Sequence, residues 1–259
     1  MLPNTGPGQL AAALHEWAAG EPWCEWLELA GSLGRGAGDE MSDVDAGLGV
    51  SDALPWVRAR DETLAAVLRF APVADHLIES LSRGIGPCAH LIVQYEDGRQ
   101  LSLVVQPAIP LGLPPGAVAL LDRTGALKEP VLPAVFAASF DTQREWAFLA
   151  WLAIGDVAKH ARRGRNWRAL TALDEARALV WRLHASVVGV DYPCFGAVSV
   201  ENAGLPAPLG LERSLPQSSE PTAVTAAAGA LAEVLSPLGA EFDVAGIRRA
   251  ALRRLATSG

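Results

Sequence analysis

A run of small residues followed by two spaced aspartates constrains this chain more than any other segment. The run is Gly31-Ser32-Leu33-Gly34-Arg35-Gly36, and the aspartates belong to Ser42-Asp43-Val44-Asp45. Alternate side chains of a β-strand point to the same face, so we expect the carboxylates of Asp43 and Asp45 to lie side by side. A turn that can approach phosphates, next to two hard oxygen ligands, predicts a site for phosphate groups and divalent cations.

Other glycine-rich motifs fit the run less well. It lacks the Gly-Lys-Ser/Thr ending of a P-loop. Asp39 stands where the dinucleotide-binding pattern G-x-G-x-x-G needs its third glycine. The segment Ala30–Gly34 is one residue away from the nucleophile elbow G-x-S-x-G of hydrolases, but that interpretation leaves the two aspartates unexplained.

The first part of the chain has the pattern of a mixed α/β domain. Apolar residues at helical or alternating spacing, separated by Gly, Pro and acidic turns, define its elements. We predict helices over 9–19 and 54–70, and strands over 24–30, 43–50, 90–95, 100–106 and 118–121.

The remainder of the chain has the pattern of a helical bundle. Apolar residues recur every three or four positions over 141–163, 167–188, 222–236 and 243–256, and a proline-rich connection covers 189–221. The sequence therefore predicts an α+β protein, in which a mixed sheet with flanking helices is followed by a C-terminal helical bundle. We expect an α/β domain over 1–138 and a helical domain over 139–259.

Composition limits the partners and the compartment. Half of the 259 residues are hydrophobic and the formal net charge is −8, without any long run of Lys or Arg. A broad nucleic-acid surface is therefore not expected, whereas nucleotides can still bind an acidic protein through metal ions. The chain has no stretch of about 20 apolar residues to cross a membrane and no basic, apolar leader, so we expect a cytoplasmic protein. The sequence gives no indication of the oligomeric state.

The order of the motif resembles the signature of the nucleotidyltransferase superfamily, which has the polymerase-β-like fold. The Gly-Ser pair, the following glycines and the Ser-Asp-hydrophobic-Asp block all occur in sequence. The resemblance implies that Asp43 and Asp45 hold one or two Mg²⁺ ions and act in catalysis. It also implies a nucleoside triphosphate such as ATP as substrate, bound by a set of residues that comprises Gly31, Ser32, Arg35, Ser42 and Lys159.

The third catalytic carboxylate of the family is missing from its expected position. The segment Glu96–Val105 resembles the hairpin that carries this group in aminoglycoside-modifying members, and counting from Gly98 places it at Ser102. A serine hydroxyl is a poor base and a weak Mg²⁺ ligand. Three interpretations remain open: Glu145 or Asp156 of the helical part serves as the base, Glu96 or Asp97 is used through a shifted register, or turnover is weak.

Two functions follow from the resemblance. The first is a Mg²⁺-dependent transfer of AMP, or of another nucleoside monophosphate, to a hydroxyl of a small acceptor. By resemblance the acceptor belongs to the aminoglycoside or lincosamide antibiotics. The alternative is a nucleotidyltransferase-like protein with weak or no catalysis, which binds a nucleotide or ligand in a regulatory role. Transfer of AMP onto a protein side chain is a third, weaker alternative.

Overall fold

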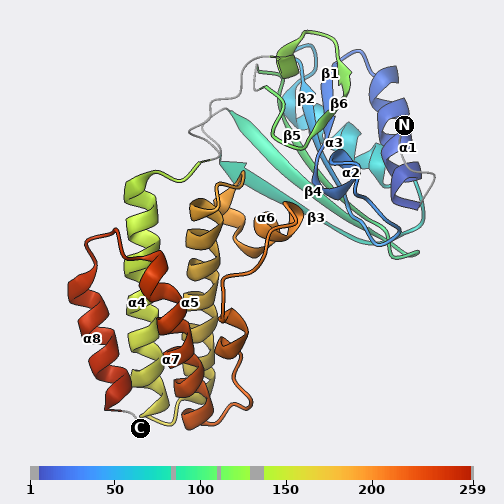
Figure 1. Ribbon diagram of the computed structural model, residues 1–259. Helices are drawn as coiled ribbons and strands as arrows, with labels where there is room; N and C mark the ends of the chain where they lie inside the picture. The colour runs from blue at the N-terminus through green and yellow to red at the C-terminus, as the bar shows by residue number, and fades with distance from the viewer. Residues whose placement is uncertain (1–5, 83–85, 110–111, 129–136, 258–259) are drawn as a thin grey trace. The chain divides into compact units, whose positions relative to one another are not determined.

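The chain consists of two compact units, which are described separately. The computed structural model describes residues 6–82, 86–109, 112–128 and 137–257. The division falls between Met1–Val131 and Leu132–Gly259. The first unit combines a six-stranded mixed sheet with helices, and the second is helical (Figure 1). The predicted α+β class, with a mixed sheet and flanking helices followed by helices alone, is confirmed.

The sheet has the strand order β3-β4-β5-β2-β1-β6. Its strands β2 and β5 run parallel, and every other neighbouring pair is antiparallel. The central position of β2 gives it a partner on both sides, which fixes the register of the strand that carries Asp45. The strands are β1 (Cys24–Leu29), β2 (Val44–Val50), β3 (Val73–Ser82), β4 (Pro87–Tyr95), β5 (Gln100–Pro107) and β6 (Val118–Asp122).

One face of the sheet forms the core of the first unit. On β5 the side chains of Leu101, Leu103 and Val105 are fully buried, and they belong to the same cluster as Leu10 and Leu14. The latter two lie on α1 (Gly6–Gly20), which covers this face together with α3 (Trp56–Val67) (Figure 1). Because side chains alternate along a strand, the residues between these leucines point to the opposite face.

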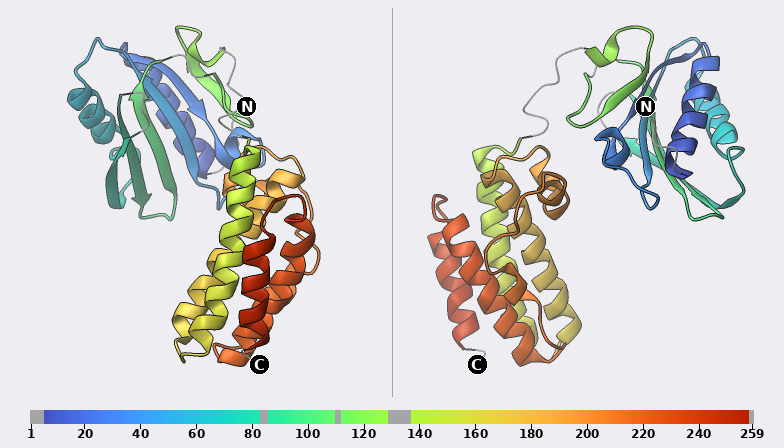
Figure 2. Two further views of the ribbon diagram at one scale, coloured as in Figure 1. Left: turned by 90° about the vertical axis from the view of Figure 1, so that its left-hand side faces the viewer. Right: turned by 45° about the vertical axis from the view of Figure 1, so that its right-hand side comes forward.

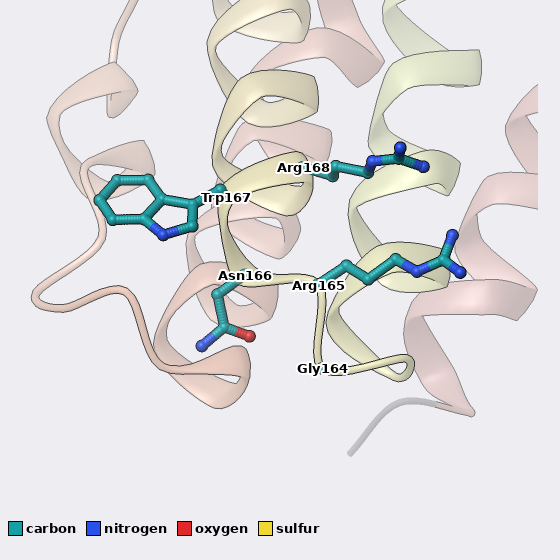
Figure 3. A pocket seen from close by; sticks show the side chains of 5 residues that line it. All are labelled: Gly164, Arg165, Asn166, Trp167 and Arg168. Atoms are coloured by element: carbon teal, nitrogen blue, oxygen red, sulfur yellow. The ribbon is translucent and has the colours of Figure 1, made fainter.

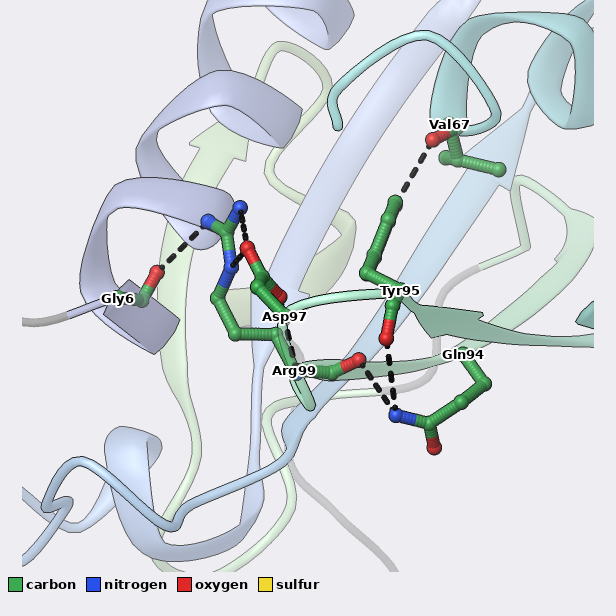
Figure 4. A network of polar contacts seen from close by, with 6 residues as sticks. All are labelled: Gly6, Val67, Gln94, Tyr95, Asp97 and Arg99. Carbon is green, nitrogen blue, oxygen red and sulfur yellow. Dashed lines mark hydrogen bonds and ion pairs between the residues drawn. The ribbon is translucent and has the colours of Figure 1, made fainter. Parts of the chain in front are cut away.

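The turn between β4 and β5 is fastened to both helices (Figure 4). Arg99 donates hydrogen bonds to Asp97 and, through Nη1, to the carbonyl oxygen of Gly6 at 3.1 Å. The Tyr95 hydroxyl donates to the carbonyl oxygen of Val67 at 2.8 Å, and burial raises the pKa of Tyr95 to about 12. The Arg99 guanidinium lowers the pKa of Asp97. These bonds hold the hairpin in a single position against α1 and α3.

The second unit is built from long helices that lie alongside one another (Figure 2). Its first helix begins with a side-chain cap, because Ser139 Oγ accepts a hydrogen bond from the Thr142 N–H at 3.1 Å. The buried faces of four helices form one apolar cluster that includes Trp151 and Leu173. The helices are α4 (Phe140–Ala161), α5 (Asn166–Val187), α6 (Ala197–Asn202), α7 (Pro221–Leu238) and α8 (Ala245–Ala256).

Two elements differ from the sequence-based expectation. The strand β3 was not predicted, because most of its side chains are exposed and its polar residues interrupt the apolar alternation. The segment 189–221 was predicted to be irregular, yet it contains the short helix α6 and two 3₁₀ turns, Pro193–Phe195 and Leu211–Ser214. None of the helices in the described part of the chain combines the length and apolar character needed to cross a bilayer.

The close packing of Trp26 against Gly49 predicts that a larger residue at position 49 destabilises the fold. Trp26 is fully buried, and a Cβ at Gly49 of the neighbouring strand would overlap its indole ring. We expect Gly49→Ala to lower the free energy of unfolding by about 1–3 kcal/mol, as overpacked cores do. Urea denaturation measures this, with Gly20→Ala as the control, because a Cβ at Gly20 meets nothing within 4 Å. Equal stability of the two variants would contradict the packing described.

Candidate functional site

The glycine-rich run forms a short helical turn that is bonded to strand β2. The turn α2 (Gly31–Gly34) follows directly after β1. The Ala30 N–H donates to the backbone carbonyl of Asp45 at 2.8 Å, and the Gly34 N–H donates to the Ala30 carbonyl at the same distance. The main chain therefore holds the turn next to the residue that carries the second aspartate.

Two glycines are required for this close approach. Gly31 has a φ of +61°, and a Cβ placed on it would overlap the Asp45 carboxylate and lie 3.0 Å from its Cγ. A Cβ on Gly34 would overlap the Leu29 carbonyl oxygen and lie 2.8 Å from that of Gly116. Any larger residue at either position would push the turn away from the strands. The small-residue pattern thus brings the backbone of the turn against a carboxylate.

Asp43 and Asp45 lie at the start of β2 and act on each other electrostatically. Asp43 is exposed and immediately precedes the strand, whereas Asp45 is half-buried within it. Burial raises the pKa of Asp45, and the negative charge of Asp43 raises it further. A hydrogen bond from Ser102 and the positive charge of Arg35 act in the opposite direction. The ionised form of Asp45 is therefore disfavoured in the fold unless a cation compensates it.

Ser102 is the direct neighbour of Asp45 across the parallel pairing of β2 and β5. The register pairs Asp45 with Ser102, and both residues lie on the sheet face opposite the core. The serine thus occupies the place beside Asp45 where the resemblance led us to look for a third carboxylate. The hairpin residue Asp97, considered as a substitute through a shifted register, is bonded to Arg99 in the turn instead.

The structure adds two residues that the sequence analysis missed. His90 of β4 and Ser102 are joined by a hydrogen bond of 2.9 Å between Nε2 and Oγ. The other ring nitrogen of His90, Nδ1, lies 3.1 Å from Oε2 of Glu79 on β3. Asp45, Ser102, His90 and Glu79 therefore form a continuous polar row across four strands. The hairpin 90–106 was predicted, so its register could have suggested His90, but Glu79 lies on the strand that was not predicted.

The remaining predicted residues of the turn have different surroundings. Ser42 Oγ accepts from the Asp39 N–H at 2.9 Å and donates to Asp39 Oδ1 at 3.1 Å, which closes the loop before β2. Arg35 is exposed at the end of α2, and its stem lies against Gly116. Ser32 is half-buried within α2. Arg35 and Ser32 are thus placed on the turn itself, whereas the Ser42 hydroxyl belongs to the loop.

The predicted residues of the helical unit lie on α4. Glu145 is exposed, and Asp156 forms an ion pair with Lys159, in which Nζ and Oδ1 are 2.6 Å apart. Arg254 of α8 also approaches the same Asp156 oxygen at 3.4 Å. Two cations therefore neutralise Asp156 within its own unit, which makes it a weaker candidate for a base than the sequence suggested. The roles of Lys159 and Glu145 stay predictions.

A surface hollow in the second unit contains none of the predicted residues. It is lined by the residues just before α5 and by its first turn, from Gly164 to Arg168 (Figure 3). The Arg165 and Arg168 side chains extend to one side and Trp167, which is 80% exposed, extends to the other. The five lining residues include no carboxylate and no nucleophile, so we assign no chemistry to this hollow.

The donor set of Asp43 and Asp45 suits magnesium. Mg²⁺ in nucleotide sites is held by one or two carboxylates, while water and substrate phosphates complete its coordination. Across the described ranges no cluster of three or more His, Cys, Asp or Glu side chains could hold a metal by itself. A cation bound there would favour the ionised form of Asp45, which burial and the charge of Asp43 disfavour.

The comparisons with known proteins give only distant structural likenesses. No protein-family model matches the chain, and neither does any curated protein sequence. Among solved structures, the chain is similar to an aminoglycoside 6-adenyltransferase from Bacillus subtilis. The two share 11% sequence identity and a TM-score of 0.38, over 97% of each chain. A likeness at this level carries no functional argument, so the function has to be inferred from the site.

The contact between Gly31 and Asp45 can be tested by a pair of matched substitutions. Gly31 and Gly36 both have positive φ, but a Cβ on Gly36 meets nothing within 4 Å. Backbone strain alone should cost both alanine variants about 1–2 kcal/mol. We expect Gly31→Ala to lose measurably more stability than Gly36→Ala in urea denaturation, because only its methyl group collides with the carboxylate. Equal losses would show that the turn does not press against Asp45.

The raised pKa of Asp45 predicts how stability depends on pH. Above the raised pKa, the ionised carboxylate destabilises the fold. Below the ordinary value of 3.8, the group is protonated in both the folded and the unfolded state and this cost disappears. We therefore expect Asp45→Asn to stabilise the protein at neutral pH in the presence of a chelator, and the gain to fade as the pH falls towards that value. The exposed Asp52→Asn serves as the control in the same thermal unfolding series, and a gain independent of pH would contradict the prediction.

Proposed function

We propose that this protein transfers a nucleoside monophosphate from a nucleoside triphosphate, with ATP as the first choice, to a hydroxyl group of a small acceptor. The observation that carries the proposal is the backbone of Gly31 held against the carboxylate of Asp45, with Asp43 beside it. A phosphate chain and a divalent cation need donors, cationic groups and carboxylates within one small region. In the first unit, this turn and the start of β2 bring these groups together.

Each residue has a defined part in the proposed reaction. Asp43 and Asp45 would hold Mg²⁺, which neutralises the charge of the triphosphate and of the pyrophosphate that leaves. Ser32 and Arg35 would bind the phosphates from the turn. The acceptor oxygen forms a bond to the α-phosphorus while the bond to pyrophosphate breaks. Positioning and charge neutralisation then supply most of the rate enhancement, as in other phosphoryl transfers.

One observation favours a second candidate function. Ser102 occupies the position beside Asp45 where a carboxylate would act as a base. A protein that binds Mg²⁺ and a nucleotide but transfers it slowly would serve as a binding or regulatory protein. Metal-dependent ATP binding in calorimetry, without pyrophosphate release for any acceptor, would favour this second function.

If the protein catalyses this transfer, removal of the carboxylate of Asp43 or of Asp45 should lower its activity. We expect the wild-type protein, incubated with ATP and Mg²⁺, to release pyrophosphate in the presence of a suitable acceptor, with aminoglycosides and lincosamides as the first panel. Asp43→Ala and Asp45→Ala should each lower the rate by at least about 10²-fold, the scale on which transition-state charge stabilisation is lost. Pyrophosphate and adenylylated product are measured by chromatography and mass spectrometry.

Asp52→Ala is the matched control for this experiment. Asp52 is an exposed aspartate that follows the opposite end of the same strand, so its removal should leave the rate unchanged. Full activity of the Asp43→Ala and Asp45→Ala variants would overturn the proposed site. Absence of nucleotide binding in the wild-type protein would overturn the proposed function as a whole.

A further inference from the structure

We propose that Ser102, His90 and Glu79 form a proton relay that replaces the missing carboxylate and takes the proton from the acceptor hydroxyl. This inference rests on the proposed function and assigns its base. The relay lies within the first unit, and it begins at the residue directly beside Asp45. No residue of the helical unit is needed for this step.

The strand register explains why the three side chains meet. Glu79 and His90 are directly paired across β3 and β4, so their side chains leave the sheet on the same face. His90 is paired with Val104 on β5, and Ser102 lies two residues away from Val104 on the same face. This diagonal places Ser102 Oγ 2.9 Å from His90 Nε2, while Glu79 Oε2 lies 3.1 Å from Nδ1.

The hydrogen bonds define which nitrogen of His90 can accept a proton. An ionised carboxylate can only accept hydrogen bonds, so Glu79 requires the proton of the imidazole to be on Nδ1. In a neutral ring, Nε2 then carries a lone pair, and Ser102 is the donor to it. This is the tautomer that a proton acceptor needs, and a carboxylate partner commonly fixes it.

The hydroxyl hydrogen of Ser102 is directed towards His90. Ser102 Oγ lies 2.9 Å from His90 Nε2, and the hydroxyl has a single hydrogen to donate. The lone pairs of Ser102 Oγ are then available to accept a hydrogen bond from the acceptor hydroxyl.

The proton-transfer step balances without a further reactant. The acceptor O–H gives its proton to Ser102 Oγ, and Ser102 gives its own hydrogen to His90 Nε2. The acceptor oxygen forms its bond to the α-phosphorus, and pyrophosphate leaves with the electron pair of the broken P–O bond. His90 is then an imidazolium whose charge is compensated by Glu79, and it returns the proton to solvent after the product leaves.

The exposure of these groups fits a relay better than a structural role. His90 is 22% exposed and Glu79 is 48% exposed, on the face that α1 and α3 leave open. Exposed pairs of this kind contribute little to stability. The gain in folding free energy is therefore small, while solvent and a small acceptor can reach the serine at its inner end.

Placing a carboxylate at position 102 provides a test of the relay. With ATP and Mg²⁺, pyrophosphate release is measured with water alone and with the acceptor panel. We expect His90→Gln to lower kcat by about 10²–10⁴-fold, the usual contribution of a general base, with the KM for ATP unchanged. The double variant Ser102→Asp with His90→Gln should recover the rate of Ser102→Asp alone, because a carboxylate beside Asp45 no longer needs the relay.

The control is His76→Gln, an exposed histidine of β3 that is paired with Val93 and lies outside the polar row. Unchanged kcat in His90→Gln, or a double variant as slow as His90→Gln, would overturn the relay and leave the proposed function standing. Activity of Ser102→Asp with an inactive wild-type protein would overturn it as well. Absence of nucleotide binding and of pyrophosphate in every variant would instead refute the proposed function. Urea denaturation of each variant confirms that it is folded.

Discussion

The parallel pairing of β2 with β5 is the constraint on which the rest of the site depends. It places Asp45 beside Ser102, and the antiparallel hairpin then brings His90 and Glu79 into the same row. A shift of one residue in this register would turn Ser102 towards the core and bring Leu101 or Leu103 to the site. The buried leucines on the opposite face of β5 prevent that shift, so the apolar core determines the polar chemistry.

Without a bound cation, the negative charges of this site destabilise the folded protein. Two aspartates lie close together, one of them is half-buried, and a glycine backbone is pressed against it. Such an arrangement costs folding free energy, and Arg35 and the polar row reduce that cost. Carboxylates with a perturbed pKa are concentrated at functional sites. A bound cation would offset this cost, as the proposed function requires.

The sequence predicted the elements whose patterns are local, and it missed those that depend on pairing. Helices such as α4 and α5 follow from their apolar spacing, and the turn at Gly31 follows from its residues alone. The strand β3 was not predicted, because its exposed polar residues do not alternate with apolar ones, and Glu79 was therefore missed as well. His90 was missed for another reason. Its partner Ser102 lies diagonally across from it on β5, and this relation depends on the pairing of two strands rather than on the sequence of either one. One of the two ion pairs of Asp156 likewise involves Arg254 of α8, which lies far along the chain.

The bond between Arg99 and the carbonyl of Gly6 joins residues that are 93 positions apart. The helix α1 precedes every strand of the sheet along the chain, yet the strands that it contacts are β1, β2 and β6, the last of which ends the sheet. During synthesis its apolar side therefore stays without its full partners until β6 has left the ribosome. Closure of this long loop comes late and is costly in entropy, which is typical of slow folding steps. The N-terminal helix thus completes the first unit rather than initiating it.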